Sequence, residues 1–105
     1  MSGGANPMRG EAMILVGGER LVLRPSFEAL VAAEAELGPL FALVERAAAG
    51  GLGLGEMVAL FWHCVRERGA HVTRDAIGAA VAEGGIASAT PVLKCLLVQI
   101  LQGRV

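Results

Sequence analysis

The chain has 105 residues, of which 54% are hydrophobic and 18% are charged, and its formal net charge is −1. This length favours one domain with a modest core, and so apolar a composition excludes intrinsic disorder as the general state. Because the arginines are scattered and form no basic stripe, the sequence lacks the charge pattern of a nucleic-acid-binding protein.

The first element that the sequence predicts is a β-hairpin over residues 10–24, after a flexible tail over residues 1–8. Apolar side chains alternate on both sides of Gly17-Gly18, and these glycines supply the positive φ angles of a tight turn. Pro25 ends the second strand because it has no N–H to donate. A lone hairpin is marginally stable in water, so it should lie on the following helices or on a neighbouring subunit.

Apolar spacing and caps predict five short helices after the hairpin, over residues about 26–37, 39–49, 56–68, 74–82 and 91–102. Ser26 and Thr73 are good N-caps, and Pro91 suits the first turn of the last helix. The glycine-dense segment 50–55 should be a flexible connector between two of these helices. The predicted fold class is therefore α+β, mainly α, with residues 9–105 forming a single domain.

The helix predicted over residues 91–102 is the most apolar, with large side chains over about half of its circumference. A chain this small can cover only part of so much apolar surface. One interpretation is a small, well-filled helical core, and the other is a surface for self-association or for a client protein. The residues assigned to that partner-binding surface are Leu93, Leu96, Leu97, Ile100, Leu101 and, from the third helix, Trp62.

The sequence offers no group of residues typical of a catalytic or metal site. His63 and Cys64 are adjacent, so on a helix they point about 100° apart, and His71 lies in a loop beyond Gly69. Cys64 and Cys95 each lie among apolar residues and are expected to be buried thiols. We therefore expect no enzyme activity, no metal and no cofactor.

Glu34 and the glycine-dense segment are the two remaining candidates, for acid–base catalysis and for phosphate binding respectively. General acid–base catalysis usually needs a second positioned group, so we expect Glu34 to pair with an arginine of the hairpin, namely Arg9, Arg20 or Arg24. The segment GGLGLG at residues 50–55 has no Lys-Ser/Thr pair and follows a helix. It is therefore interpreted as a linker and not as a phosphate-binding loop.

The sequence also indicates where the protein should reside. No apolar run approaches the ~20 residues that a membrane-crossing helix needs. Residues 1–5 lack the charged and then apolar pattern of a signal peptide. Together with two unpaired thiols, this predicts a cytoplasmic protein that does not bind a membrane.

Several short motifs together resemble a known family. They are the opening Asn6-Pro7-x-Arg9-Gly10-Glu11, the Gly17-Gly18 turn, the helix end Glu34-x-x-Leu37-Gly38 and the segment Leu43-Val44-Glu45-Arg46. Over about residues 6–85 the chain resembles the small proteins encoded in gene transfer agent and siphophage-like tail gene clusters. That family is usually described as tail assembly chaperones and, in some catalogues, as tail tube proteins. Residues 66–71 depart from the glycine-rich helix end that is typical of relatives.

This resemblance implies a non-catalytic role, in which the chain binds the long, helical, aggregation-prone tape measure protein while tail tube subunits polymerise around it. It also implies self-association, which the open strand edges of the hairpin would allow, and a second partner in the tail tube protein. The alternative is a structural tail tube subunit that forms hexameric rings. Such subunits are usually larger β-sandwiches, and this chain has too few strand-like segments for one, so we prefer the chaperone.

Overall fold

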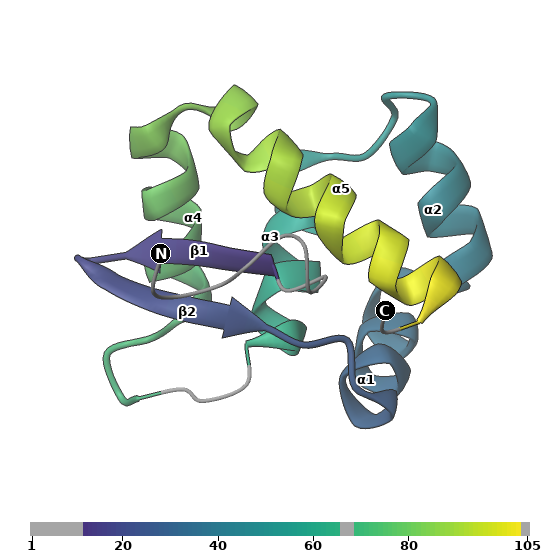
Figure 1. Ribbon diagram of the computed structural model, residues 1–105, viewed down its shortest axis with the longest axis horizontal. Coiled ribbons are helices and arrows are strands. Elements are labelled where there is room, and N and C mark those ends of the chain that lie inside the picture. Colours follow the sequence, from purple (N-terminus) through teal and green to yellow (C-terminus); the bar gives the residue numbers. More distant parts are fainter. Residues whose placement is uncertain (1–11, 66–68, 104–105) are drawn as a thin grey trace, which may run out of the picture.

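The computed structural model describes residues 12–65 and 69–103 of the chain. In this part, an N-terminal β-hairpin is followed by five helices (Figure 1), so the predicted α+β, mainly helical fold is confirmed. The tail predicted over residues 1–8 and the motif residues 9–11 lie outside the described residues.

The hairpin consists of two antiparallel strands, β1 (Ala12–Val16) and β2 (Glu19–Leu23). Gly17 and Gly18 join them with φ angles of 58° and 84°, as predicted for a turn that L side chains would strain. Because side chains alternate along a strand, one face of the ribbon is buried, through Ala12, Ile14, Val16, Leu21 and Leu23. The ribbon therefore lies on the helices of its own chain.

The outer edge of β2 is partly occupied. Leu23 forms an antiparallel bridge with Val65, and the N–H of Arg24 donates to the carbonyl of Cys64 at 2.7 Å. The expectation that open hairpin edges could join copies therefore fails at this end of β2. Within the described residues, no strand pairs with the outer edge of β1.

The first two helices, α1 (Phe27–Leu37) and α2 (Leu40–Ala48), contact each other and begin and end within one residue of their predicted bounds. The hydroxyl of Ser26 accepts a hydrogen bond from the N–H of Ala29 at 3.1 Å, which is the predicted N-cap of α1. Gly38 ends α1 with a φ of 94°. The two helices therefore form a short helical hairpin at one end of the molecule.

The third helix, α3 (Leu54–Cys64), differs at both ends from the prediction of residues 56–68. It begins earlier because the carboxylate of Glu56 accepts a hydrogen bond from the N–H of Gly53 at 2.9 Å, which fixes a first turn inside the glycine-dense segment. It ends earlier because Val65 is extended and pairs with β2. The last three residues of the predicted helix lie outside the described part of the chain.

The last two helices, α4 (Arg74–Gly84) and α5 (Ile86–Gln102), meet at Gly85. The hydroxyl of Thr73 accepts a hydrogen bond from the N–H of Ala76 at 3.0 Å, which confirms the predicted cap of α4. The helix continues two residues beyond the predicted end, up to the glycine pair.

The start of α5 differs more from the sequence prediction, because Pro91 lies inside the helix and not in its first turn. Gly85 has a φ of 89°, which allows the chain to leave α4 and enter another helix without a longer loop. The N–H and the hydroxyl of Ser88 both donate to the carbonyl of Gly85, at 3.0 and 2.7 Å, and stabilise this early turn. Pro91 has no N–H, so it donates no hydrogen bond to the preceding turn of the helix.

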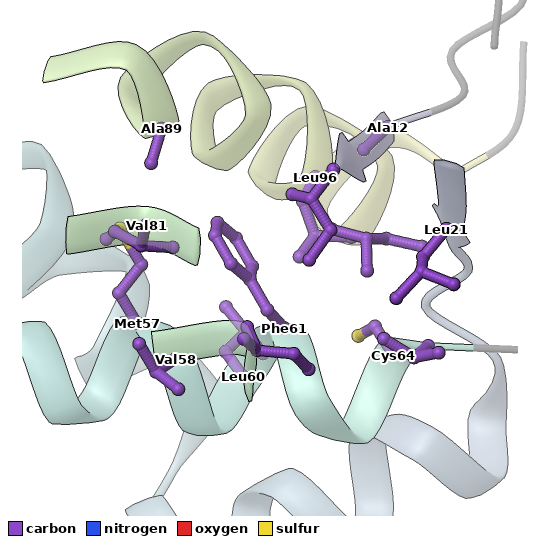
Figure 2. Close-up of a cluster of buried hydrophobic side chains, with 14 of the residues drawn as sticks. Ala12, Leu21, Met57, Val58, Leu60, Phe61, Cys64, Val81, Ala89 and Leu96 are labelled. Atoms are coloured by element: carbon purple, nitrogen blue, oxygen red, sulfur yellow. The ribbon is translucent and has the colours of Figure 1, made fainter. Parts of the chain in front are cut away.

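The core lies between the hairpin, α3, α4 and α5. Figure 2 shows Phe61 projecting from α3 into the space between Val81 of α4 and Leu96 of α5. Phe61 and Leu96 have no exposed surface, and α3 supplies six buried residues in all. Helix α5 crosses one face of the molecule from α4 to the end where α1 and α2 lie (Figure 1). Its C-terminal turns therefore reach the helical hairpin.

Candidate protein-binding surface

The surface with the clearest binding character is an apolar groove between α1, α2 and the last turns of α5. Its volume is about 240 Å³. All of its lining residues are apolar, namely Leu30 from α1, Leu40, Phe41 and Val44 from α2, and Ile100 and Leu101 from α5. We call this feature the α1–α2–α5 groove. Its walls are helices, so an elongated apolar ligand could lie along it.

The groove exists because α1 and α2 bury very little against the rest of the chain. Each contributes one buried residue, Ala33 from α1 and Leu43 from α2. Their largest apolar side chains point outward instead, with Phe27 84% and Phe41 81% exposed. On α5, Leu101 is 54% exposed and lines the groove together with Phe41. One end of the molecule therefore presents large apolar side chains from three helices.

The structure separates the six residues that the sequence assigned to partner binding. Ile100 and Leu101 line the groove, whereas Leu96 is fully enclosed in the core and cannot reach a partner while the protein stays folded. The other three are partly buried: Leu93 and Leu97 on α5, and Trp62 on α3. Of these six residues, the two that line the groove therefore lie at the C-terminal end of α5.

Sequence reasoning missed the groove residues on the first two helices, above all Phe41. On α1, Leu30 lines the groove, whereas Phe27 is exposed but does not line it, and spacing alone does not say whether a helix face is covered. On α2 the apolar residues are too widely spread for one buried face, since Leu43 turns inward while Phe41 and Val44 turn to the groove. The wide spread of apolar residues around α2 was therefore the feature of the sequence that could have indicated the groove.

A second hollow lies between the glycine turn of the hairpin and the corner of α4 and α5, with a volume of about 680 Å³. Its lining mixes apolar side chains such as Met13 and Val92 with the turn glycines, Glu83 and Ser88. Leu15, on β1, is 58% exposed beside it. The hollow is larger than the α1–α2–α5 groove, but a glutamate and a serine are among its lining residues, whereas every residue that lines the groove is apolar, so we regard the hollow as the weaker candidate.

A charged cluster holds α1 against α3 and α4. The carboxylate of Glu36 accepts two hydrogen bonds from Arg74 at 2.6 Å each and lies 2.7 Å from Nε2 of His63. The Arg74 guanidinium, followed by His63, lowers the pKa of Glu36 to about 2. Arg74 also lies 5.9 Å from the ring centre of Trp62. This cluster fixes the side of α1 that faces α3 and α4, so the other face of the helix can remain exposed.

Glu34 has a contact that the sequence did not suggest. Its carboxylate accepts a hydrogen bond from the backbone N–H of Leu40 at 3.1 Å, so it caps the start of α2. Of the three expected arginine partners, Arg9 lies outside the described residues. A second ion pair, Arg46 with Glu56 at 2.7 Å, holds α2 to the first turn of α3.

The histidines and cysteines serve structural contacts. His63 pairs with Glu36, and His71 pairs with Glu19 of β2. Burial raises the pKa of the Cys64 thiol to about 12, which leaves little thiolate to act as a nucleophile. Among the residues that the structure describes, no three His, Cys, Asp or Glu side chains gather closely enough to hold a metal ion.

The described helices were also compared with the length of a bilayer span. None of them alone is both long and apolar enough to cross a membrane. Helices α4 and α5 would reach the required length and composition only together, and the chain bends by 118° between them.

The fold and its groove define a class of small α+β protein that presents an apolar surface at one end. The family model described as "Phage tail tube protein, GTA-gp10" matches residues 9–103. The chain therefore belongs to this family of phage tail proteins, which confirms the resemblance to gene transfer agent and phage tail proteins. The match extends to residue 103, well beyond the region where the sequence motifs were found. No curated protein and no solved structure matches the chain.

Proposed function

We propose that this protein is a non-catalytic tail assembly chaperone that binds the tape measure protein in the α1–α2–α5 groove. The observation that carries the proposal is the position of Phe41, which lines the groove and is 81% exposed. Apolar side chains that gather at one end of a small protein usually mark a site where another protein binds. Membership of a phage tail family makes another tail protein the natural occupant.

The shape of the groove suits a helical client. Its walls come from three helices, and an amphipathic helix binds such a groove by placing its apolar stripe inward. Covering a phenylalanine of this kind contributes about 1.5–3 kcal/mol. One contact of that strength is weak, but many copies along a long client would add up to stable coverage. A weak single contact would also allow removal when the tube polymerises.

A second candidate function is that of a structural tail tube subunit. The description of the matching family favours it, because that description names a tail tube protein. The small amount of β-structure argues against it, because the described residues contain one two-stranded sheet. A tube subunit should be abundant in finished particles and should form tubes alone. Mass spectrometry of purified particles separates the two candidates, because a chaperone should be nearly absent from them.

The direct test is co-expression with the tape measure protein from the same gene cluster. The wild-type chain should co-purify with the tape measure protein and keep it soluble. Phe41→Ser should abolish both effects, whereas Leu15→Ser, which alters an exposed leucine on the hairpin, should preserve them. If Phe41→Ser retains the client as well as the wild type does, the groove is not the binding site.

The same proposal includes the partners and the place of assembly. Tail assembly would occur in the cytoplasm, with several copies of the chain along one tape measure protein and the tail tube protein as the next component to arrive. Light scattering coupled to gel filtration, with and without the client, measures the number of copies. A strict one-to-one complex would contradict multiple coverage.

A further inference from the structure

Charge is distributed unevenly along the described part of the chain. Helices α1 and α2 together contain four glutamates, Glu28, Glu34, Glu36 and Glu45, and one basic residue, Arg46. The remaining described residues carry four acidic and four basic side chains, so their charges cancel. The excess of negative charge therefore lies on the two helices that form two walls of the α1–α2–α5 groove.

Two of these glutamates flank the groove itself. Glu34 follows Leu30 by one turn of α1, and its hydrogen bond to Leu40 fixes it beside the lining of α2. Glu45 follows Phe41 by one turn of α2. Both side chains are exposed, and within the described residues neither forms an ion pair. Each of these two walls therefore has, at its rim, a carboxylate that forms no ion pair within the described residues.

Among residues 12–65 and 69–103, the other charges nearby do not cancel this pair. Glu36 is neutralised by Arg74, and Arg46 is neutralised by Glu56 on α3. On the third wall, Lys94 stands two turns before Leu101 on α5. It therefore lies away from the end of the groove that Leu101 lines.

We propose that the α1–α2–α5 groove binds one amphipathic α-helix whose apolar stripe is flanked by lysine or arginine side chains. The apolar stripe would cover Phe41 and Leu101, and the basic flanks would meet Glu34 and Glu45. This inference rests on the proposed function in taking a protein client as the occupant. It goes further because it states which kind of segment the client must supply.

The charges also distinguish this occupant from two others. A second copy docked symmetrically would bring two acidic helix pairs against each other, which like charges disfavour. An anionic lipid surface would be repelled for the same reason. A helix with basic flanks is the occupant for which both the apolar lining and the rim charges are favourable.

The test uses the full chain and two synthetic peptides of about 18 residues, enough for five helical turns. Both peptides carry the same leucine stripe, flanked by lysines in one and by glutamates in the other. Fluorescence anisotropy should give a Kd about tenfold lower for the lysine peptide at low salt, with the difference shrinking as salt screens the charges. Equal affinities for the two peptides would overturn the proposal.

Substitutions at Glu45 and Phe41, with Leu15→Ser as the control, locate the effect on the groove. Glu45→Lys should reduce or reverse the difference in Kd between the two peptides. If the lysine variant folds poorly, Glu45→Gln can replace it and should reduce the difference less. Phe41→Ser should lose the lysine peptide, while Leu15→Ser should bind it like the wild type. Unchanged peptide binding by Phe41→Ser would overturn the proposal, as would a dimer that this substitution dissociates, because a second copy would then occupy the groove.

The outcomes also separate this inference from the proposed function. If the wild-type chain retains the tape measure protein but binds neither peptide better than Phe41→Ser does, the inference fails and the proposed function stands. If the lysine peptide binds at the groove but the tape measure protein is not retained, the proposed function fails and the helix preference stands.

Discussion

Two regions of this protein use similar amino acids in opposite ways. Helix α3 buries six of its residues in the centre of the molecule, with Phe61 fully enclosed. Helices α1 and α2 are also rich in alanine, leucine and phenylalanine, yet each buries one residue and leaves Phe27 and Phe41 in solvent. An apolar pattern therefore indicates which side chains avoid water, but not whether the same chain covers them.

The two regions should differ in what their residues contribute. Substitutions around α3 should change the free energy of unfolding, because they leave cavities in a packed interior. Substitutions on the open face of α1 and α2 should change binding and leave stability nearly intact. Measurements of unfolding test this division, and the largest loss of stability is expected in the core around α3.

Phe61→Ala should have the largest effect. The side chain is fully enclosed between α3, α4 and α5, so its removal leaves a cavity and should lower the free energy of unfolding by about 3–5 kcal/mol. Urea denaturation followed by circular dichroism measures the change. A variant with the wild-type midpoint would show that α3 is not the centre of the core, and the contrast between the two regions would disappear.

Leu43→Ala should come next, because Leu43 is the buried residue by which α2 is attached to the molecule. We expect a loss of about 2–3 kcal/mol, toward the lower end of such substitutions because the site lies at the edge of the core. Hydrogen exchange should show faster opening of α2 than of α3. Equal acceleration in both helices would mean that the two regions unfold as one unit.

Glu34→Ala should have a smaller effect, about 0.5–1 kcal/mol, because it leaves the first N–H of α2, that of Leu40, without its side-chain acceptor. Glu34→Gln keeps an acceptor oxygen and should lose less. Thermal unfolding of both variants separates this capping role from an ion pair with the hairpin. If the Gln and Ala variants lose the same stability, the negative charge and not the hydrogen bond is what matters.

Acid should weaken the charged contacts that hold α1 against α3 and α4. The pKa of Glu36 is lowered from 4.5 to about 2, so its contacts with Arg74 and His63 stabilise the fold fully above about pH 4.5. This contribution is lost as the pH falls through about 2, when the carboxylate takes up a proton in the folded state. Urea midpoints of the wild type should therefore decline across this range, and those of Glu36→Gln should decline less. Parallel declines would show that Glu36 does not contribute.

The sequence predicted the parts of the fold that depend on local chemistry. The glycine turn, the caps at Ser26 and Thr73 and the fold class follow from neighbouring residues alone, and all are confirmed. The early end of α3 could not be predicted, because it depends on the pairing of Val65 with β2, far away in sequence. The early start of α5 was missed because a proline usually lies in the first turn of a helix, whereas Pro91 lies inside α5.

Only part of the candidate site was predicted from the sequence, namely those residues of the apolar stripe on the last helix that line the groove. The sequence assigned Ile100 and Leu101 of the last helix to partner binding, and both residues line the groove. The spacing along that helix could not show that Leu96 turns inward, because a stripe that covers half of a helix includes buried and open positions alike. The other two walls depend on how α1 and α2 pack, which is a property of the folded chain.

Phe41→Ser should give the smallest change in stability and therefore the sharpest test of the comparison. Its side chain is 81% exposed, so the free energy of unfolding should stay within about 0.5 kcal/mol of the wild type. Urea denaturation beside Phe61→Ala makes the contrast direct, since both remove one phenylalanine ring. A large loss for Phe41→Ser would mean that the groove is part of the core and closes on itself. A negligible loss, together with a loss of client binding, would show that this ring contributes to binding a partner and not to folding.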